Sequence, residues 1–183
     1  MRPIFTIHAG EFLAGDFIQR SFRRVQLWIP AKDTGVDLLV TNAASSESVS
    51  LQVKFSRDFT ATHLTPALQR GVRAAGWWSL NRDKLESSRA DLWIFVLVGF
   101  GKSATDFVVI PPGDLLRRLD AIHPAAKTIQ SYLWVTNDER CWEARGLRQA
   151  DQTLVASGQF SDIDRDFSAY LNSWGAIEHL NTV

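Results

Sequence analysis

The chain has 183 residues, 45% of them hydrophobic and 22% charged, which is typical of one globular domain with a substantial core. Its formal net charge is zero, which argues against a protein that coats nucleic acid through bulk charge. A single cysteine excludes an internal disulfide and a cysteine-based zinc site. The sequence has no apolar run of 18 residues and no secretion signal, so we expect a cytoplasmic protein without a membrane partner.

The first predicted element is a helix that runs from about residue 8 to residue 22. Gly15, Ile18 and Phe22 recur at helical spacing and form its core-facing stripe. Glu11 lies at the edge of the same stripe, where an unpaired carboxylate would be costly. We therefore expect a partner for Glu11 in the interior.

Three strands follow as a meander, at residues 25–29, 36–40 and 49–55. In the third strand every second residue is apolar, the pattern of a strand with one face in a core. Gln52 and Lys54 share the opposite face, about 6.6–7 Å apart along the strand. Asp37 lies among apolar residues on the second strand, the expected antiparallel neighbour of the third.

The rest of the chain is predicted to alternate between helices and strands. The ranges are 66–80 for a helix, 92–100 and 106–110 for strands, 111–122 for a helix, 132–136 and 140–146 for a hairpin, and 164–180 for a terminal amphipathic helix. The apolar face of that last helix, with Tyr170 and Trp174, suits a dimer contact. This order indicates a single α/β domain over residues 1–183, with a central sheet covered by helices.

The unusual polar residues of the first third would meet at one place. Asp37 would lie across from Gln52 and Lys54 on adjacent strands, and Glu11 would approach from the helix. Magnesium takes one or two carboxylates and completes its shell with waters and phosphate oxygens. A nearby lysine can hold the attacking water or stabilise charge on the phosphate. These groups suffice for the hydrolysis of a phosphodiester bond.

Glu11, the G-V-D sequence ending at Asp37 and the Q-V-K sequence from Gln52 to Lys54 resemble the PD-(D/E)XK nuclease superfamily, over roughly residues 8–57. The resemblance implies a restriction-endonuclease-like α/β fold with a central mixed β-sheet flanked by helices. It implies Asp37, Gln52 and Glu11 as metal ligands for Mg²⁺ or Mn²⁺, and Lys54 as the catalytic lysine. DNA would be the partner and a homodimer the working form.

Two positions depart from the pattern of that superfamily. Val36 stands where a proline usually precedes the aspartate, and Gln52 stands where Glu or Asp is usual. Because Gln52 brings no negative charge, the anionic ligands would be Asp37 and Glu11 alone. Two functions follow as alternatives: a metal-dependent DNA endonuclease, or a catalytically silent nuclease-like fold that acts as a nucleic-acid-binding or assembly module.

Single residues of this set also have ordinary structural interpretations. Asp37 alone could cap a backbone amide, and Lys54 alone could be a surface lysine. Arg57 follows the third strand and could contact phosphate. Arg70 and Arg73, three residues apart on the predicted second helix, could line a DNA groove. Solvated surface charges explain these three arginines equally well.

Overall fold

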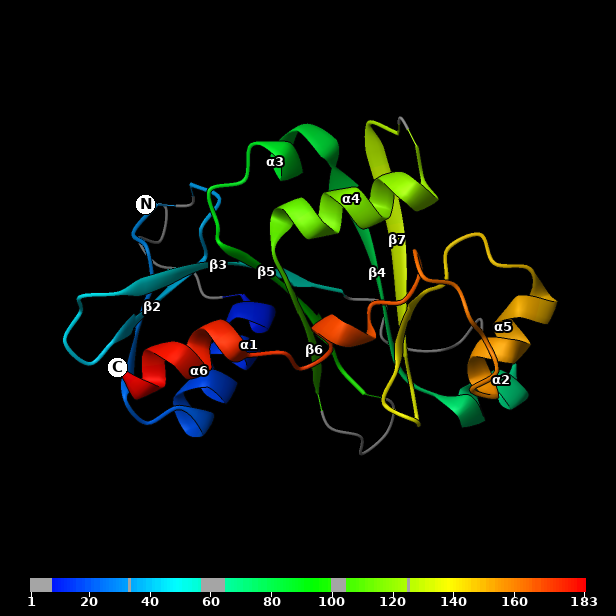
Figure 1. The fold of residues 1–183 in the computed structure, drawn as a ribbon, viewed down its shortest axis with the longest axis horizontal. Helices are drawn as coiled ribbons and strands as arrows, with labels where there is room; N and C mark the ends of the chain where they lie inside the picture. The colour runs from blue at the N-terminus through cyan, green and yellow to red at the C-terminus, as the bar shows by residue number, and fades with distance from the viewer. Residues whose placement is uncertain (1–7, 33, 57–64, 100–104, 125) are drawn as a thin grey trace.

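A computed structural model describes residues 8–32, 34–56, 65–99, 105–124 and 126–183 of the chain (Figure 1). The predicted α/β class is confirmed: helices flank two separate β-sheets. The sequence does not predict a second sheet, because one of its three strands lies in a segment predicted as a helix. No helix in the described part of the chain is both long and apolar enough to cross a membrane.

The larger sheet is mixed and has five strands in the described residues. They are β1 (Val25–Trp28), β2 (Leu38–Asn42), β3 (Ser48–Phe55), β5 (Leu92–Leu97) and β6 (Asp106–Ile110), and they lie side by side in this order. β1, β2 and β3 form the predicted antiparallel meander, whereas β5 runs parallel to β3 and antiparallel to β6. β2 starts one residue after Asp37, so the aspartate precedes the strand on which it was predicted.

The smaller sheet contains three antiparallel strands, β4 (Val72–Asn81), β7 (Thr128–Thr136) and β8 (Cys141–Glu143). β7 and β8 form the predicted hairpin. The helix predicted over residues 66–80 is wrong, because only α2 (Pro66–Gly71) is helical and the remainder is β4. From Trp77 onward exposed and buried residues alternate, and the long antiparallel pairing with β7 outweighs the local helical preference.

Each sheet face is covered by its own apolar layer. α1 (Ala9–Ser21) and α6 (Gly175–Thr182) lie together on one face of the five-stranded sheet (Figure 1). The helix α1 comes so close that a Cβ atom on Gly10 would lie 2.6 Å from Cβ of Phe55. The other face shares a core with α3 (Arg82–Glu86), α4 (Pro112–Ile122) and the small sheet. α2 and α5 (Gln149–Ala156) cover the outer face of the small sheet.

The terminal helix predicted over residues 164–180 is also wrong in its first half. The structure has a 3-10 turn, η1 (Ser168–Tyr170), and then α6. Asn172 breaks the helix between them, with a φ of 50°. Its side chain accepts a hydrogen bond from Phe107 N and donates one to Asp106, which ties the break to β6. Trp174 stacks on Phe17 at 5.0 Å and is buried, so it is not exposed for the dimer contact expected of it.

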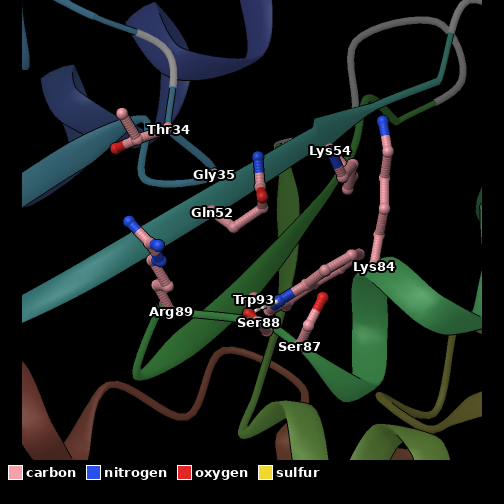
Figure 2. Close-up of a pocket in the computed structure, with 9 residues that line it drawn as sticks. All are labelled: Thr34, Gly35, Gln52, Lys54, Lys84, Ser87, Ser88, Arg89 and Trp93. Atoms are coloured by element: carbon pink, nitrogen blue, oxygen red, sulfur yellow. Dashed lines mark hydrogen bonds between the residues drawn. The ribbon is translucent and has the colours of Figure 1, made fainter.

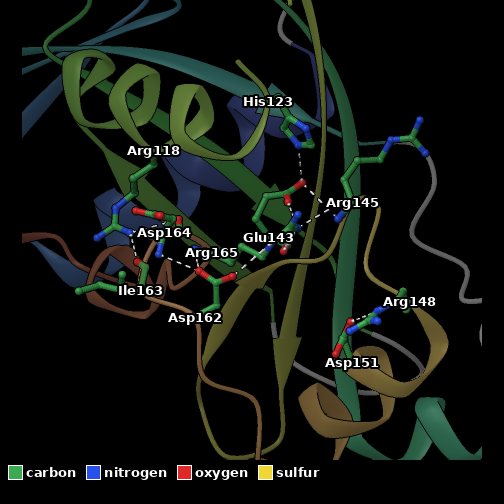
Figure 3. A network of polar contacts seen from close by, with 10 residues as sticks. All are labelled: Arg118, His123, Glu143, Arg145, Arg148, Asp151, Asp162, Ile163, Asp164 and Arg165. Atoms are coloured by element: carbon green, nitrogen blue, oxygen red, sulfur yellow. Dashed lines mark hydrogen bonds and ion pairs between the residues drawn. The ribbon is translucent and has the colours of Figure 1, made fainter.

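A buried ionic network joins the end of β8 to the loop before η1 (Figure 3). The carboxylate of Glu143 is fully buried and accepts hydrogen bonds from Tyr132 N and Arg145 N. Arg165 Nη1 donates to Glu143 Oε2 at 2.8 Å and also to two backbone carbonyls. Burial raises the pKa of Glu143 to about 7. Burial and the charges of Arg165 and Arg145 lower the pKa of neighbouring His123.

Candidate functional site

Asp37 and Gln52 meet where β2 begins. The backbone N–H of Asp37 donates to Leu51 O at 2.8 Å, which continues the antiparallel pairing of β2 with β3. Oδ2 of Asp37 then accepts two hydrogen bonds, from Gln52 Nε2 at 2.8 Å and from Val53 N at 2.7 Å. The structure therefore brings the aspartate and the glutamine together as the sequence predicted. It also gives Asp37 the amide-capping contact that was its alternative interpretation.

Lys54 lies on the same face of β3 as Gln52, two residues further along. The parallel pairing of β3 with β5 sets Gln52 beside Trp93 and Lys54 beside Phe95. Nζ of Lys54 lies 5.1 Å from the centre of the Trp93 ring, a cation–π contact. Lys54 is half-buried, so its ammonium group is held against the sheet rather than extended into solvent.

A pocket of about 620 Å³ opens over this face of the sheet (Figure 2). Gln52 and Lys54 form its floor with Trp93, and Thr34 and Gly35 of the loop before β2 form one edge. Asp37 is not among the lining residues; it lies next to them through its hydrogen bond to Gln52. The two central residues of the predicted site therefore face a cavity of the size that accepts small ligands.

The opposite wall of the pocket comes from residues that the sequence did not identify as functional. Lys84, Ser87, Ser88 and Arg89 belong to α3 and to the connector that leads into β5. In the sequence this segment is only a charged connector, more than 25 residues after Lys54. Its one signal is a pair of serines and an arginine directly before an apolar strand, a combination too common to single it out.

Glu11 has a different position from the one predicted for it. It lies on α1, which packs on the face of the sheet opposite to Gln52 and Lys54. Its carboxylate accepts a hydrogen bond from His8 N at 3.1 Å and completes a capping box at the start of the helix. The described partner of Glu11 is therefore local, not in the interior. Its part in a metal site stays a prediction.

Of the three candidate arginines, the structure describes Arg70 and Arg73, and these two lie on different elements. Arg73 lies on β4, not on a helix with Arg70, and that part of the prediction is wrong. Its guanidinium forms a bidentate ion pair with the buried carboxylate of Asp106, at 2.7 and 3.0 Å. This pair raises the pKa of Arg73, and the charge of Asp106 compensates that of Arg73. Arg70 is exposed at the end of α2. Arg57 lies outside the described residues.

The ligand atoms for a metal ion are few. Within the residues that the structure describes, no three His, Cys, Asp or Glu side chains gather in a position to hold one. Because Gln52 uses Nε2 to reach Asp37, its amide oxygen is the atom left to act as a ligand. Asp37 offers one carboxylate. One carboxylate and one amide oxygen fit magnesium, which keeps several waters, better than a metal that needs a full protein cage.

Comparisons with known proteins found no relatives from which a function could be carried over. No protein-family model, no curated protein and no solved structure matches the chain. The resemblance in the first third of the chain therefore depends on four residues and their spacing. A function for this protein has to follow from the geometry and the charge of its own residues.

Proposed function

We propose that the protein is a metal-dependent DNA endonuclease whose site comprises Asp37, Gln52 and Lys54. One observation carries the proposal: Gln52, which is hydrogen-bonded to Asp37 directly before β2, shares with Lys54 the face of β3 that forms the floor of a pocket. A carboxylate and an amide oxygen can hold a metal ion, and a nearby lysine can assist metal-dependent phosphodiester hydrolysis. The cavity distinguishes this face of β3 from an ordinary strand face that is simply exposed to solvent.

Each residue has a role in this chemistry. Asp37 and Gln52 would hold Mg²⁺ or Mn²⁺, which supplies Lewis-acid activation of the phosphate and of water when bound. The N–H of Val53 fixes the Asp37 carboxylate against the strand, so that it does not have to be ordered when a ligand arrives. Lys54 would stabilise the charge that develops on the phosphate and orient the attacking water. For Glu11 to join as a third ligand, it would have to leave His8 and reach the site from the opposite face of the sheet.

The arrangement of elements supports the same proposal. The resemblance implies a helix followed by a meander whose second and third strands carry the site. α1 precedes β1, β2 and β3, and Asp37 and Lys54 lie at β2 and on β3. A homodimer with one site for each DNA strand belongs to the proposal as well.

A second candidate is a module that binds nucleic acid without cutting it. The hydrogen bond from Gln52 to Asp37 favours this function, since the neutral amide satisfies the carboxylate without a cation. With a glutamate at position 52, the two like charges would need a metal or a proton between them. The pocket and its cations would then serve binding alone.

Cleavage assays on a panel of DNA substrates separate the two functions. Supercoiled plasmid, linear duplex, single strand and a four-way junction are incubated with EDTA, Mg²⁺ or Mn²⁺. We expect metal-dependent cutting by the wild type and a loss of about 10²–10³-fold in Lys54→Ala and in Asp37→Asn. Asp37→Asn keeps an oxygen for the hydrogen bond from Val53 N, which preserves the fold.

Arg148→Gln provides the control, because Arg148 is an exposed residue at the start of α5, on the outer face of the small sheet. It should cut like the wild type. If no protein cuts any substrate while DNA is still bound, the non-cutting module is correct. Cutting that survives both Asp37→Asn and Lys54→Ala would place the active site elsewhere.

A further inference from the structure

The wall formed by α3 and the α3–β5 connector is held rigidly along its length. At its start, Asn81 caps α3 by accepting a hydrogen bond from Lys84 N at 3.0 Å. In its middle, Ser88 Oγ accepts hydrogen bonds from Trp93 Nε1 at 2.9 Å and from Ala90 N at 3.3 Å. The backbone that carries Lys84 is therefore fixed to the helix, and the connector is fixed to the floor of the pocket.

The far end of the connector is fastened to β3. Asp91 accepts hydrogen bonds from the backbone N–H and from the hydroxyl group of Ser50, at 2.8 and 2.6 Å. The N–H of Asp91 donates back to Ser50 O at 3.0 Å. Arg89 lies between Ser88 and Asp91, both of which are anchored, and its side chain lines the pocket. A ligand that met Arg89 would find its backbone already ordered, which lowers the entropy cost of binding.

The charged residues that line the pocket, among those that the structure describes, are all basic. Lys54, Lys84 and Arg89 line it, and none of the lining residues that the structure describes is acidic. Among the described residues, no ion pair or side-chain hydrogen bond is found for Lys84 or Arg89. Several other arginines, Arg73 and Arg165 among them, are bound to carboxylates. Three cations around one cavity attract an anion with more than one charged group.

Among its described lining residues, the pocket has no open aromatic face on which a base could stack. Its aromatic residue, Trp93, is only 3% exposed, donates its Nε1–H to Ser88 and has Lys54 over its ring. Proteins that bind single-stranded nucleic acid commonly stack the bases on exposed aromatic side chains. The lining groups that remain are cations and hydroxyl groups, which suit phosphate oxygens. Arg89 and Lys84 appear on opposite sides of the pocket, with Gln52 and Trp93 between them (Figure 2).

We infer that this wall is a phosphate-binding rail: Arg89 and Lys84 hold phosphates on either side of the one that reaches Gln52 and Lys54. The pocket accordingly takes the sugar–phosphate backbone of a nucleic-acid strand and does not read its bases. The inference rests on the proposed function only for the choice of DNA as the strand. Arg89 and Lys84 are positioning residues, because the reaction itself is assigned to Asp37, Gln52 and Lys54.

Binding in EDTA tests the rail apart from any cleavage. The probes are a fluorescent single-stranded DNA 12-mer and a 12-mer of the same length whose sugars carry no bases. The full chain is compared with Arg89→Gln, Lys84→Gln and, as the matched control, Arg148→Gln. We expect each rail variant to bind about 5–10-fold more weakly and to lower the slope of log affinity against log salt by about one. The control should bind like the wild type.

The abasic probe should bind within about threefold of the normal 12-mer, since phosphate contacts carry the affinity. The inference fails if the rail variants match the wild type, if the wild type binds neither probe, or if removal of the bases abolishes binding. Phosphate-dependent binding by a protein that cuts nothing in Mg²⁺ would retain the rail and remove only the hydrolytic function.

Discussion

Two polar clusters of this molecule, the pocket on the five-stranded sheet and the network around Glu143, use charge in opposite ways. In the network, Glu143 is closed off from solvent and is bound by Arg165 and by two backbone amides. In the pocket, Lys84 and Arg89 face a cavity with no described acidic partner. A buried charged side chain whose partners all lie within the protein stabilises the fold and is not available to a ligand. A charged side chain that has no described partner, on a backbone that is hydrogen-bonded, is available to a ligand.

The comparison also shows why a shifted pKa is a poor guide to function by itself. Glu143 has its pKa raised to about 7, a value that would suit a general acid or base. Its carboxylate is fully buried, however, and its hydrogen bonds join β8, β7 and the loop at Arg165. The shift reports burial within a structural network. Geometry, not the pKa, separates the two clusters.

The largest expected effect is the loss of stability when the network is broken. At pH 8, where Glu143 is ionised, Arg165→Met keeps most of the side-chain volume but leaves the buried Glu143 carboxylate without its cation. We expect a loss of about 3–5 kcal/mol in the free energy of unfolding. Arg148→Met removes the exposed ion pair with Asp151 and should cost about 0–1 kcal/mol. Urea denaturation measures both, and equal losses in the two variants would contradict a structural role for the network.

A smaller effect is expected when a second carboxylate is placed beside that of Asp37. Gln52→Glu removes the hydrogen bond to Asp37 and sets two carboxylates side by side. In EDTA this variant should lose about 1–2 kcal/mol in the free energy of unfolding, and Mg²⁺ should restore it. Gln26→Glu on β1, where the amide also donates a hydrogen bond, is the matched control. Denaturation with and without Mg²⁺ decides the matter: a variant that is insensitive to Mg²⁺ would argue against a metal at Asp37.

The smallest expected effect concerns pH. Because the pKa of Glu143 is raised from its usual 4.5 to about 7, this carboxyl group stabilises the fold fully below pH 4.5 and loses that contribution as the pH rises through 7. Glu143→Gln imitates the protonated form, so its Tm should gain a few degrees on that of the wild type between pH 5 and pH 8. His123 is present in both proteins, so its own titration largely cancels in the difference. A constant difference in Tm across this range would contradict a titration of Glu143 near pH 7.

Much of the fold follows from local patterns in the sequence. Period-two alternation predicts β3, and helical spacing with Gly15 and Ile18 inward predicts α1. Both failures are segments in which distant partners decide the structure. Residues 72–81 are a strand because β7, almost fifty residues later, pairs with them along their length. Residues 164–180 break at Asn172, because its amide group bonds to β6.

The candidate site divides in the same way. The meeting of Asp37 with Gln52 and the shared face of Gln52 and Lys54 follow from a hairpin between neighbouring strands, which sequence alternation reports directly. The positions of Lys84 and Arg89 cannot be predicted in this way, because these residues reach the pocket only through the parallel pairing of β3 with β5. Local sequence patterns do not predict which connector will lie beside which strand.

That parallel pairing has a consequence for the order in which the protein folds. Between the end of β3 at Phe55 and the start of β5 at Leu92, the chain leaves the first sheet, builds β4 in the second, and returns through α3. A loop of this length closes against a larger entropy cost than the hairpins of the meander. We expect the meander to form early and the cavity to be completed late. A nascent chain would thus bring Asp37 beside Gln52 before the opposite wall of the pocket is in place.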